Sequence, residues 1–250
     1  MPSIVFLLDV DNTLLDNDSV KANLDEHLQA ALGPELAKRF WDIYEQVRKE
    51  KGVVDIPEAL TRFREQTSTA EMDEQTYQHI HSLFDHYPFD KALYPYALET
   101  IQHLKTIGQV VIVSDGDLDF QAEKIFNSAL ADAVEGRVLL YTHKQEHLDE
   151  ITQRYPADHY VIIDDKPDIL ADTKKVLGPK VTTIFVKQGK YAARKPPEHF
   201  VPDIIVDHIG DLRNYTAEQF LSPDQGEGYG NTLLSDASHR PAEDCSSLGG

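Results

Sequence analysis

Short apolar runs recur along the chain and end in polar residues. They cover residues 3–9, 109–114, 137–142, 159–164 and 181–186, with a weaker run at 203–206. An unbroken apolar run of this length is typical of a strand buried on both faces of a parallel sheet. The pattern therefore predicts five central strands and a weaker sixth.

Amphipathic stretches with helical spacing separate the later strands. They cover residues 96–107, 118–129, 145–155 and 168–177. Strand and helix thus alternate, which predicts right-handed βαβ crossovers and a doubly wound, Rossmann-like α/β fold. In such folds ligands gather at the carboxyl ends of the strands.

One long segment, residues 18–89, breaks this alternation, because it contains no convincing strand pattern. It predicts about four helices, the first with an N-cap at Asp18-Ser19 and an end at Gly33, and the second with Pro34 in its first turn. We interpret residues 18–89 as a helical cap inserted into a core formed by residues 1–17 and 90–221.

Three aromatic residues lie close together in this insertion, at Phe40, Trp41 and Tyr44. They can line a substrate pocket, but aromatic residues at helical spacing more often serve packing. We therefore expect them to form part of the core of the insertion.

The composition restricts the partners and the location of the protein. A formal net charge of -19 argues against nucleic acid and anionic membranes as partners, since both attract positive charge. The chain has no apolar run of about twenty residues and no basic segment before the first strand, so we expect a cytoplasmic protein. Residues 222–250, rich in Gly, Ser, Asp and Pro, are expected to form a flexible acidic tail.

Two carboxylates, Asp9 and Asp11, follow the first strand. If that strand stays extended through residue 11, both side chains lie on the same side of it. Such a pair repels itself unless a cation is present, and carboxylate, carbonyl and water oxygens are the ligands that Mg²⁺ prefers. The alternative is that Asp11-Asn12 is a solvated turn with an Asx bond.

A second acidic pair, Asp164-Asp165, follows the strand at 159–164. Acids at this position can act as helix N-caps, as Asp168 can. Two adjacent acids at the end of another strand of the same sheet are harder to explain in this way. We therefore expect both acidic pairs to face one cavity.

Two further strands end in groups suited to bind an anion. Ser114-Asp115-Gly116 offers a hydroxyl and backbone amides, although the same residues also form ordinary turns. Lys144 begins a predicted helix, where the macrodipole disfavours a cation unless an anion lies nearby.

The order of these four strand ends resembles the four motifs of the haloacid dehalogenase superfamily. The resemblance covers about residues 1–17 and 90–213, and the stretch with Gln121, Lys124 and Ile125 also looks like the segment that follows the second motif. The helical insertion between the first and second motifs is similar to a cap of the first type.

The resemblance implies a Mg²⁺-dependent phosphohydrolase that acts on a small phosphorylated metabolite through an aspartyl-phosphate. Asp9 would be the nucleophile and Asp11 the general acid and base. Phosphate would be bound by Asn12, Ser114, Asp115, Gly116 and Lys144. Mg²⁺ would be held by Asp9, the backbone carbonyl of Asp11 and the pair Asp164-Asp165, with Asp165 the preferred direct ligand and Asp164 an open alternative.

Three other functions share parts of this pattern. A phosphosugar mutase needs the same Asp pair together with a cap that retains a bisphosphorylated intermediate. A 2-haloacid dehalogenase has no leaving oxygen to protonate and so does not need an acid at position 11. A non-catalytic phospho-binding module would not require all four motifs. Neither the substrate nor the oligomeric state follows from the sequence.

Overall fold

Six parallel strands form the centre of the computed structural model, which describes residues 2–52, 54–116 and 118–223. Their spatial order is β3-β2-β1-β4-β5-β6. The strands are β1 (Ile4–Leu8), β2 (Gln109–Asp115), β3 (Val138–Tyr141), β4 (His159–Asp164), β5 (Val181–Val186) and β6 (Ile204–Val206). The predicted doubly wound α/β fold is confirmed, including its short sixth strand.

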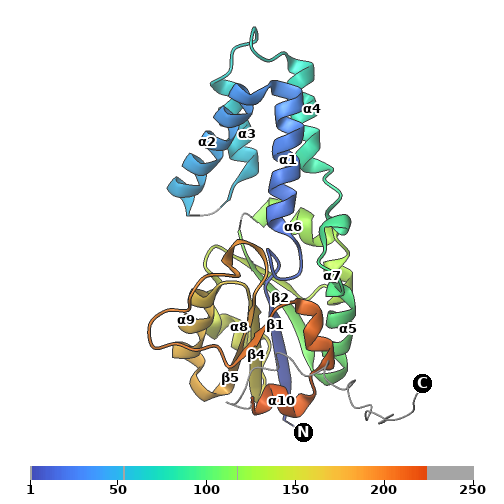
Figure 1. Ribbon diagram of the computed structural model, residues 1–250, viewed down its shortest axis with the longest axis vertical. Coiled ribbons are helices and arrows are strands. Elements are labelled where there is room, and N and C mark those ends of the chain that lie inside the picture. The colour runs from blue at the N-terminus through green and yellow to red at the C-terminus, as the bar shows by residue number, and fades with distance from the viewer. Residues whose placement is uncertain (1, 53, 117, 224–250) are drawn as a thin grey trace, which may run out of the picture.

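Helices cover both faces of the sheet (Figure 1). Successive residues of β1 alternate between two buried clusters, with Phe6 and Leu8 in one and Val5 and Leu7 in the other. Residues of α5, α6, α7 and α10 belong to the first cluster, and residues of α8 and α9 to the second. These helices are α5 (Ala97–Ile107), α6 (Leu118–Asn127), α7 (Leu130–Ala133), α8 (Leu148–Arg154), α9 (Pro167–Leu177) and α10 (Ala217–Leu221).

Four further helices stand together beyond the carboxyl end of β1 (Figure 1). They are α1 (Asn17–Leu32), α2 (Pro34–Lys51), α3 (Ile56–Glu65) and α4 (Glu74–Asp85). Their buried apolar side chains, including Val20 and Phe40, belong to the same cluster as Phe6 and Leu8 of the sheet. The apolar interior is therefore continuous from the sheet into the inserted helices. Their role as a cap stays a prediction.

Three predicted helix boundaries differ from the structure. The N-cap of α1 is Asp16, whose Oδ1 accepts from the Ser19 amide at 2.9 Å, whereas Asp18 accepts from the Lys190 amide. Helix α9 begins at Pro167, so Asp168 lies inside its first turn. A 3₁₀ turn, Lys144–Glu146, precedes α8 and shortens the helix expected at 145–155.

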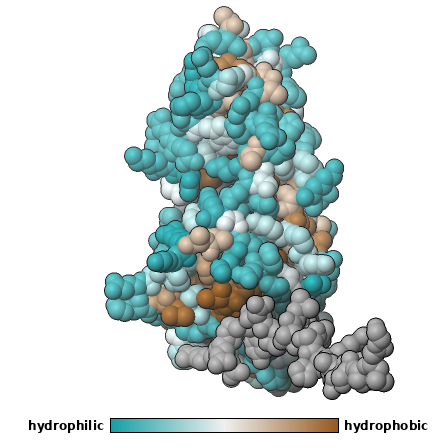
Figure 2. Space-filling model, in the orientation of Figure 1, coloured by the Kyte–Doolittle hydropathy of each residue, from teal (hydrophilic) through white to brown (hydrophobic). Residues whose placement is uncertain are grey.

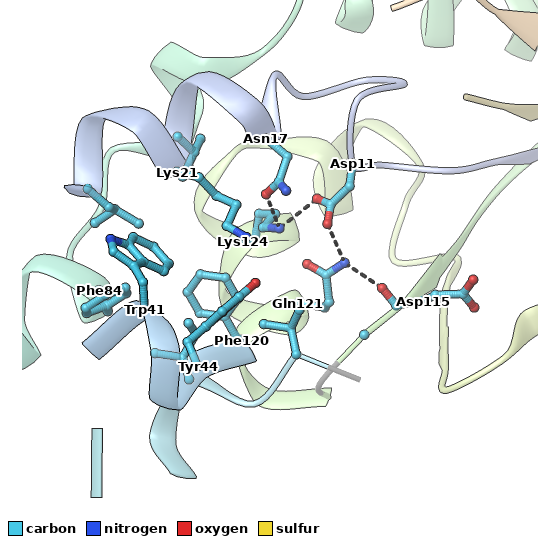
Figure 3. Close-up of a pocket in the computed structure, with 15 residues that line it drawn as sticks. Asp11, Asn17, Lys21, Trp41, Tyr44, Phe84, Asp115, Phe120, Gln121 and Lys124 are labelled. Carbon is cyan, nitrogen blue, oxygen red and sulfur yellow. Dashed lines mark hydrogen bonds and ion pairs between the residues drawn. The ribbon is translucent and has the colours of Figure 1, made fainter. Parts of the chain in front are cut away.

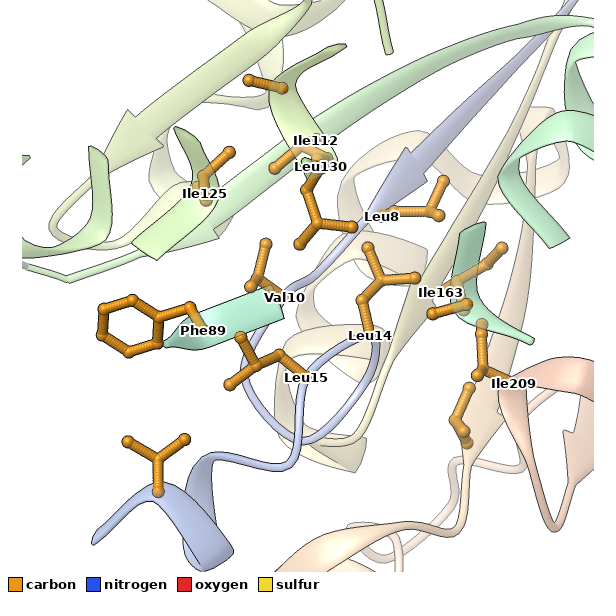
Figure 4. Packing of buried hydrophobic residues seen from close by; sticks show 14 of the residues in the cluster. Leu8, Val10, Leu14, Leu15, Phe89, Ile112, Ile125, Leu130, Ile163 and Ile209 are labelled. Atoms are coloured by element: carbon orange, nitrogen blue, oxygen red, sulfur yellow. The ribbon is translucent and has the colours of Figure 1, made fainter. Parts of the chain in front are cut away.

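A tight turn follows β1 and separates Asp9 from Asp11. The Val10 carbonyl accepts from the amides of Thr13, Leu14 and Leu15 at 2.9–3.2 Å. The side chains of Val10, Leu14 and Leu15 are fully buried in the apolar core and hold the turn in place (Figure 4). The strand therefore ends at Leu8 and does not stay extended through residue 11, so the condition for placing Asp9 and Asp11 on the same side of it is not met.

The visible face of the molecule is mostly hydrophilic, with small apolar areas (Figure 2). In the described part of the chain, no helix combines the length and the apolar character needed to cross a membrane. The tail predicted at 222–250 lies, after Pro223, outside the described residues.

Candidate active site

Four strand ends meet at one edge of the sheet because β3, β2, β1 and β4 are neighbours. Leu8 pairs with Ile163, and the Asp9 amide donates to the Ile163 carbonyl at 3.0 Å. This register places Asp9 level with the acidic pair that ends β4. Carboxylate oxygens of Asp9, Asp164 and Asp165 lie within 4.8 Å of one another, so three of the four acids expected to share a cavity lie together.

Lys144 lies at the centre of this group. Its Nζ donates to Asp9 Oδ1 at 2.5 Å and to the Val113 carbonyl at 3.1 Å, and it forms an ion pair with Asp164 Oδ2 at 2.7 Å. Burial lowers the pKa of Lys144, but the carboxylates of Asp164 and Asp9 outweigh this effect and raise it. A lysine at the start of a helix is expected to need a nearby anion. The carboxylates of Asp9 and Asp164 are such anions.

Asp115 holds the backbone of Lys144 in place. Its Oδ1 accepts from the Lys144 amide at 2.7 Å. The carboxylate of Asp115 therefore positions the lysine, a role that the sequence analysis does not anticipate for this residue.

Asp9 keeps its negative charge although its side chain is only 2 % exposed. Burial raises the pKa of Asp9, but the ammonium groups of Lys144 and Lys166 lower it by more than burial raises it. The net shift is therefore downward. Thr13 adds a weak hydrogen bond to Asp9 Oδ2 at 3.3 Å. The result is a buried, ionised and oriented carboxylate, as a nucleophile requires.

Asp165 differs from its two acidic neighbours because both of its oxygens are buried without a hydrogen-bond partner among the described residues. Burial, together with the charges of Asp164 and Asp9, raises the pKa of Asp165 to about 9. Asp164, by contrast, accepts from the Lys166 amide at 2.8 Å and pairs with Lys144. Buried oxygens are normally paired, so the free pair on Asp165 fits a hard cation with oxygen ligands.

Asp11 belongs to a separate network on the side of the inserted helices. Lys124 Nζ lies 2.6 Å from Asp11 Oδ1 and 3.1 Å from Asn17 Oδ1, and Gln121 Nε2 lies 3.4 Å from Asp11 Oδ2 (Figure 3). The carboxylate of Asp11 is not part of the three-acid group. Only its backbone carbonyl therefore stays a predicted metal ligand.

Gln121 connects this network to Ser114. Its Nε2 donates to Ser114 Oγ at 3.0 Å and to the Asp115 carbonyl at 2.9 Å. Gly116 makes this arrangement feasible, because it has a φ of +150° and a Cβ there would lie 2.6 Å from Gln121 Cγ. Since Ser114 accepts from Gln121, its own hydroxyl proton can point toward a bound anion.

Two residues that the sequence analysis assigns to phosphate binding have backbone amides that already have acceptors. The Gly116 amide donates to the Tyr141 carbonyl at 3.0 Å, and the Asn12 amide donates to the Leu15 carbonyl at 2.7 Å. The Asn12 side chain accepts from the Asp18 amide at 3.3 Å and is only 2 % exposed. In this conformation both residues shape turns, and neither amide is free to bind phosphate.

The sequence analysis gives no catalytic role to Lys124, Gln121 or Lys166. Gln121 and Lys124 are three residues apart on α6 and are both almost fully buried. Two long polar side chains on the buried face of a helix are unusual, and this pattern is the signal that points to them. Lys166 adjoins the acidic pair, and its charge acts on Asp9, Asp164 and Asp165.

A cavity of about 470 Å³, including its open mouth, lies between the inserted helices and α6. Asp11, Gln121 and Lys124 line one side of it, and Trp41 and Tyr44 line the other (Figure 3). Tyr44 belongs to the buried core and Trp41 packs against it, as expected, and both also line the cavity. Phe40 is fully buried, with ring contacts to Phe63 and Phe84, as expected.

Comparison with solved structures shows a similar fold over most of the chain. A haloacid dehalogenase-like hydrolase from Burkholderia xenovorans LB400 is 44% identical, with a TM-score of 0.77 over 86% of this chain and 99% of the other. The L-2-haloacid dehalogenase of Xanthobacter autotrophicus, with chloropropionic acid covalently bound, is 16% identical, with a TM-score of 0.56 over 84% and 96%. A magnesium-bound haloacid dehalogenase-type protein of Bacillus subtilis is 17% identical, with a TM-score of 0.55 over 85% and 97%. The last two show the fold alone.

A search among curated proteins found no match. A comparison with sequence-family profiles agrees with the structural comparison. The profile of haloacid dehalogenase-like hydrolases matches residues 5–186, which include both acidic pairs, Ser114 and Lys144. The chain therefore belongs to the haloacid dehalogenase-like hydrolase family.

Proposed function

We propose that the protein is a Mg²⁺-dependent phosphatase that uses Asp9 as its nucleophile. The observation that carries the proposal is the free pair of buried oxygens on Asp165, close to the carboxylates of Asp9 and Asp164. Three carboxylates face two ammonium groups, those of Lys144 and Lys166. A divalent cation would favour the ionised form of all three acids, would more than offset their surplus of one negative charge and, when bound, would draw charge from the phosphoryl group under attack.

The surplus of buried negative charge favours a phosphatase over a dehalogenase. A phosphate ester brings further negative charge to Asp9, so attack on it needs more positive charge than the two lysines supply. Displacement of halide at carbon has no such need. A second feature supports the proposal, because Asp11 lines the cavity beside the site and would protonate a leaving oxygen, which a halide does not require.

The proposed reaction has two steps. An oxygen of Asp9 forms a bond to phosphorus while the bond to the ester oxygen breaks, and Asp11 gives its proton to that oxygen. Asp11 then takes a proton from water, whose oxygen attacks phosphorus and releases Asp9 and inorganic phosphate. Most of the charge in the transition state lies on the equatorial oxygens. Ser114 would donate to one of them, and the charge of Lys144 would act on these oxygens from its place beside Asp9.

Of the two acids after β4, Asp165 is the stronger candidate for a direct metal ligand. Asp164 already accepts from the Lys166 amide and pairs with Lys144, whereas Asp165 has no such partner among the described residues. Asp164 would then act mainly by holding Lys144 beside Asp9.

The test is turnover of a panel of phosphate monoesters with Mg²⁺ and with EDTA. We expect phosphate release that requires Mg²⁺ and is lost in Asp165→Asn, but not in the control Asp172→Asn, which changes a half-exposed acid paired with Lys175. Phosphate release that is unaffected by EDTA would contradict the proposal. Halide release from 2-haloacids, or isomerised sugar phosphate in place of free phosphate, would instead indicate a dehalogenase or a mutase.

A further inference from the structure

The cavity between the inserted helices and α6 opens onto the proposed acid but not onto the nucleophile. Asp11 is among its lining residues, whereas Asp9 is not. In the proposed reaction Asp11 protonates the leaving oxygen. Whatever fills the cavity is therefore attached to that oxygen, and the cavity is placed to hold the leaving group.

The wall opposite Asp11 is mainly apolar and aromatic. Trp41, Tyr44 and Phe84 contribute rings, and aliphatic side chains of α1 and α3 fill the space between them, while Phe120 of α6 adds a ring on the side of Lys124 (Figure 3). The polar atom of Trp41 already has a partner, since Nε1 donates to Asp25 Oδ1 at 2.7 Å. Apart from the Tyr44 hydroxyl, this wall therefore offers a ligand apolar surface and few hydrogen bonds.

The two cations among the described lining residues already have carboxylate neighbours. Lys124 lies 2.6 Å from Asp11, and Lys21 lies 3.7 Å from Glu45. The ammonium group of Lys21 also lies 4.3 Å from the centre of the Tyr44 ring. A second anionic group on the substrate would have to compete with these carboxylates and with the strongly negative net charge.

We propose that the cavity selects phosphate monoesters whose leaving group is an uncharged, apolar alcohol that carries a ring. This inference rests on the proposed phosphatase function and adds the substrate class to it. An aromatic ring gains contacts with Trp41 and Tyr44 and loses little hydration. A sugar would lose the water around its hydroxyls without finding enough partners on this wall.

The first test compares esters whose leaving alcohols have similar acidity, so that intrinsic reactivity does not decide the outcome. Phenethyl phosphate is compared with a hexose phosphate esterified at its primary hydroxyl, and acetyl phosphate serves as a small substrate that does not need the cavity. We expect kcat/KM for phenethyl phosphate to exceed that for the hexose phosphate by about thirtyfold or more. Equal values, or a preference for the hexose phosphate, would overturn the inference while leaving the phosphatase function intact. Failure to release phosphate from any of these three compounds would overturn both.

The second test places the preference on Trp41. Trp41→Ala should lower kcat/KM for phenethyl phosphate about tenfold, mainly through KM, and change that for acetyl phosphate much less. A folding defect would lower both values alike, so an equal loss for both substrates would contradict the role of Trp41. The matched control is Tyr77→Ala, which removes another half-buried aromatic side chain of the insertion that does not line the cavity.

A substitution of Lys21 should raise kcat/KM for phenethyl phosphate, whereas Trp41→Ala should lower it. Lys21→Leu extends the apolar wall, so kcat/KM for phenethyl phosphate should rise severalfold. If Lys21 instead binds an anionic or hydroxylated part of the natural substrate, the same variant should lower turnover of the hexose phosphate and leave phenethyl phosphate without any gain. That result would overturn the proposal.

Discussion

Asp9 and Asp11 are two residues apart, yet each has its own lysine and its own surroundings. Asp9 pairs with Lys144 among buried groups that all come from strand ends, and both side chains are at most 3 % exposed. Asp11 pairs with Lys124 of α6, and this network includes Asn17, the first residue of the inserted helices. The side chain of Asp11 is 25 % exposed and faces the cavity.

The difference in surroundings suggests how the proposed catalytic roles of Asp9 and Asp11 differ. Asp9 is held by the sheet, whose register does not depend on the substrate. Asp11 is held by groups that also contact the inserted helices, so its placement depends on how those helices sit over the leaving group. Substitutions near Asp9 should therefore affect all substrates alike, whereas substitutions near Asp11 should depend on the leaving group.

The largest expected effect is that of Asp9→Asn. An amide is a poor nucleophile and cannot form the aspartyl-phosphate, so turnover should fall by about four powers of ten or more for every ester. Steady-state phosphate release from acetyl phosphate and phenethyl phosphate measures it, with circular dichroism as a control for folding. Activity that survives in this variant would refute the assignment of the nucleophile.

Asp11→Asn should have a smaller effect that depends on the leaving group. Loss of the general acid should slow single-turnover release of phenethyl alcohol by about two to four powers of ten. Release of acetate from acetyl phosphate, which needs little protonation, should slow far less. If both leaving groups are released with equal loss, Asp11 acts on something other than the leaving oxygen.

Lys124→Met should follow the pattern of Asp11, with a loss of about tenfold to a hundredfold, because Lys124 holds Asp11 without touching the reacting atoms. In single-turnover release of the leaving group, the loss should be larger for phenethyl phosphate than for acetyl phosphate, and Lys124→Arg should restore part of it. Lys105→Met is the control, because Lys105 is a partly buried lysine, less buried than Lys124, that pairs with a carboxylate, Glu135, outside the site. An equal loss for both substrates would assign Lys124 a purely structural role.

The smallest predicted effect is on stability. Burial and the charges of Asp164 and Asp9 raise the pKa of Asp165 to about 9. Between about pH 4 and pH 9 the folded, metal-free protein therefore keeps a proton on Asp165 that the unfolded chain has lost. Its stability should therefore fall as pH rises from about 4 to about 9, and Asp165→Asn should remove this contribution. In thermal melts with EDTA, the melting temperature of the variant should exceed that of wild type by a few degrees, and by more at pH 8 than at pH 6. This corresponds to a difference of about 1–2 kcal/mol in the free energy of unfolding. Mg²⁺ should raise the melting temperature of wild type only, and the opposite pH trend would contradict the origin of the shift.

The sequence predicts the sheet and the strand ends well, because buried parallel strands give long apolar runs and a parallel sheet places their carboxyl ends together. It predicts the turn after β1 poorly. An extended strand and a turn would both leave Asp9 and Asp11 at the same end of β1, so their spacing does not distinguish the two conformations. The burial of Leu14 and Leu15 decides for the turn, and this burial depends on packing across the molecule. The role of Lys124 is missed for the same reason, because its partner lies 113 positions away along the chain.

The most direct test of the account is to trap the covalent intermediate. Asp11→Asn should still accept the phosphoryl group from acetyl phosphate with Mg²⁺ but should hydrolyse it slowly, since the base that activates water is missing. Acid quenching followed by peptide mass spectrometry should find one phosphoryl group on Asp9. A phosphoryl group on another residue, or none on the enzyme while phosphate is released, would contradict Asp9 as the nucleophile.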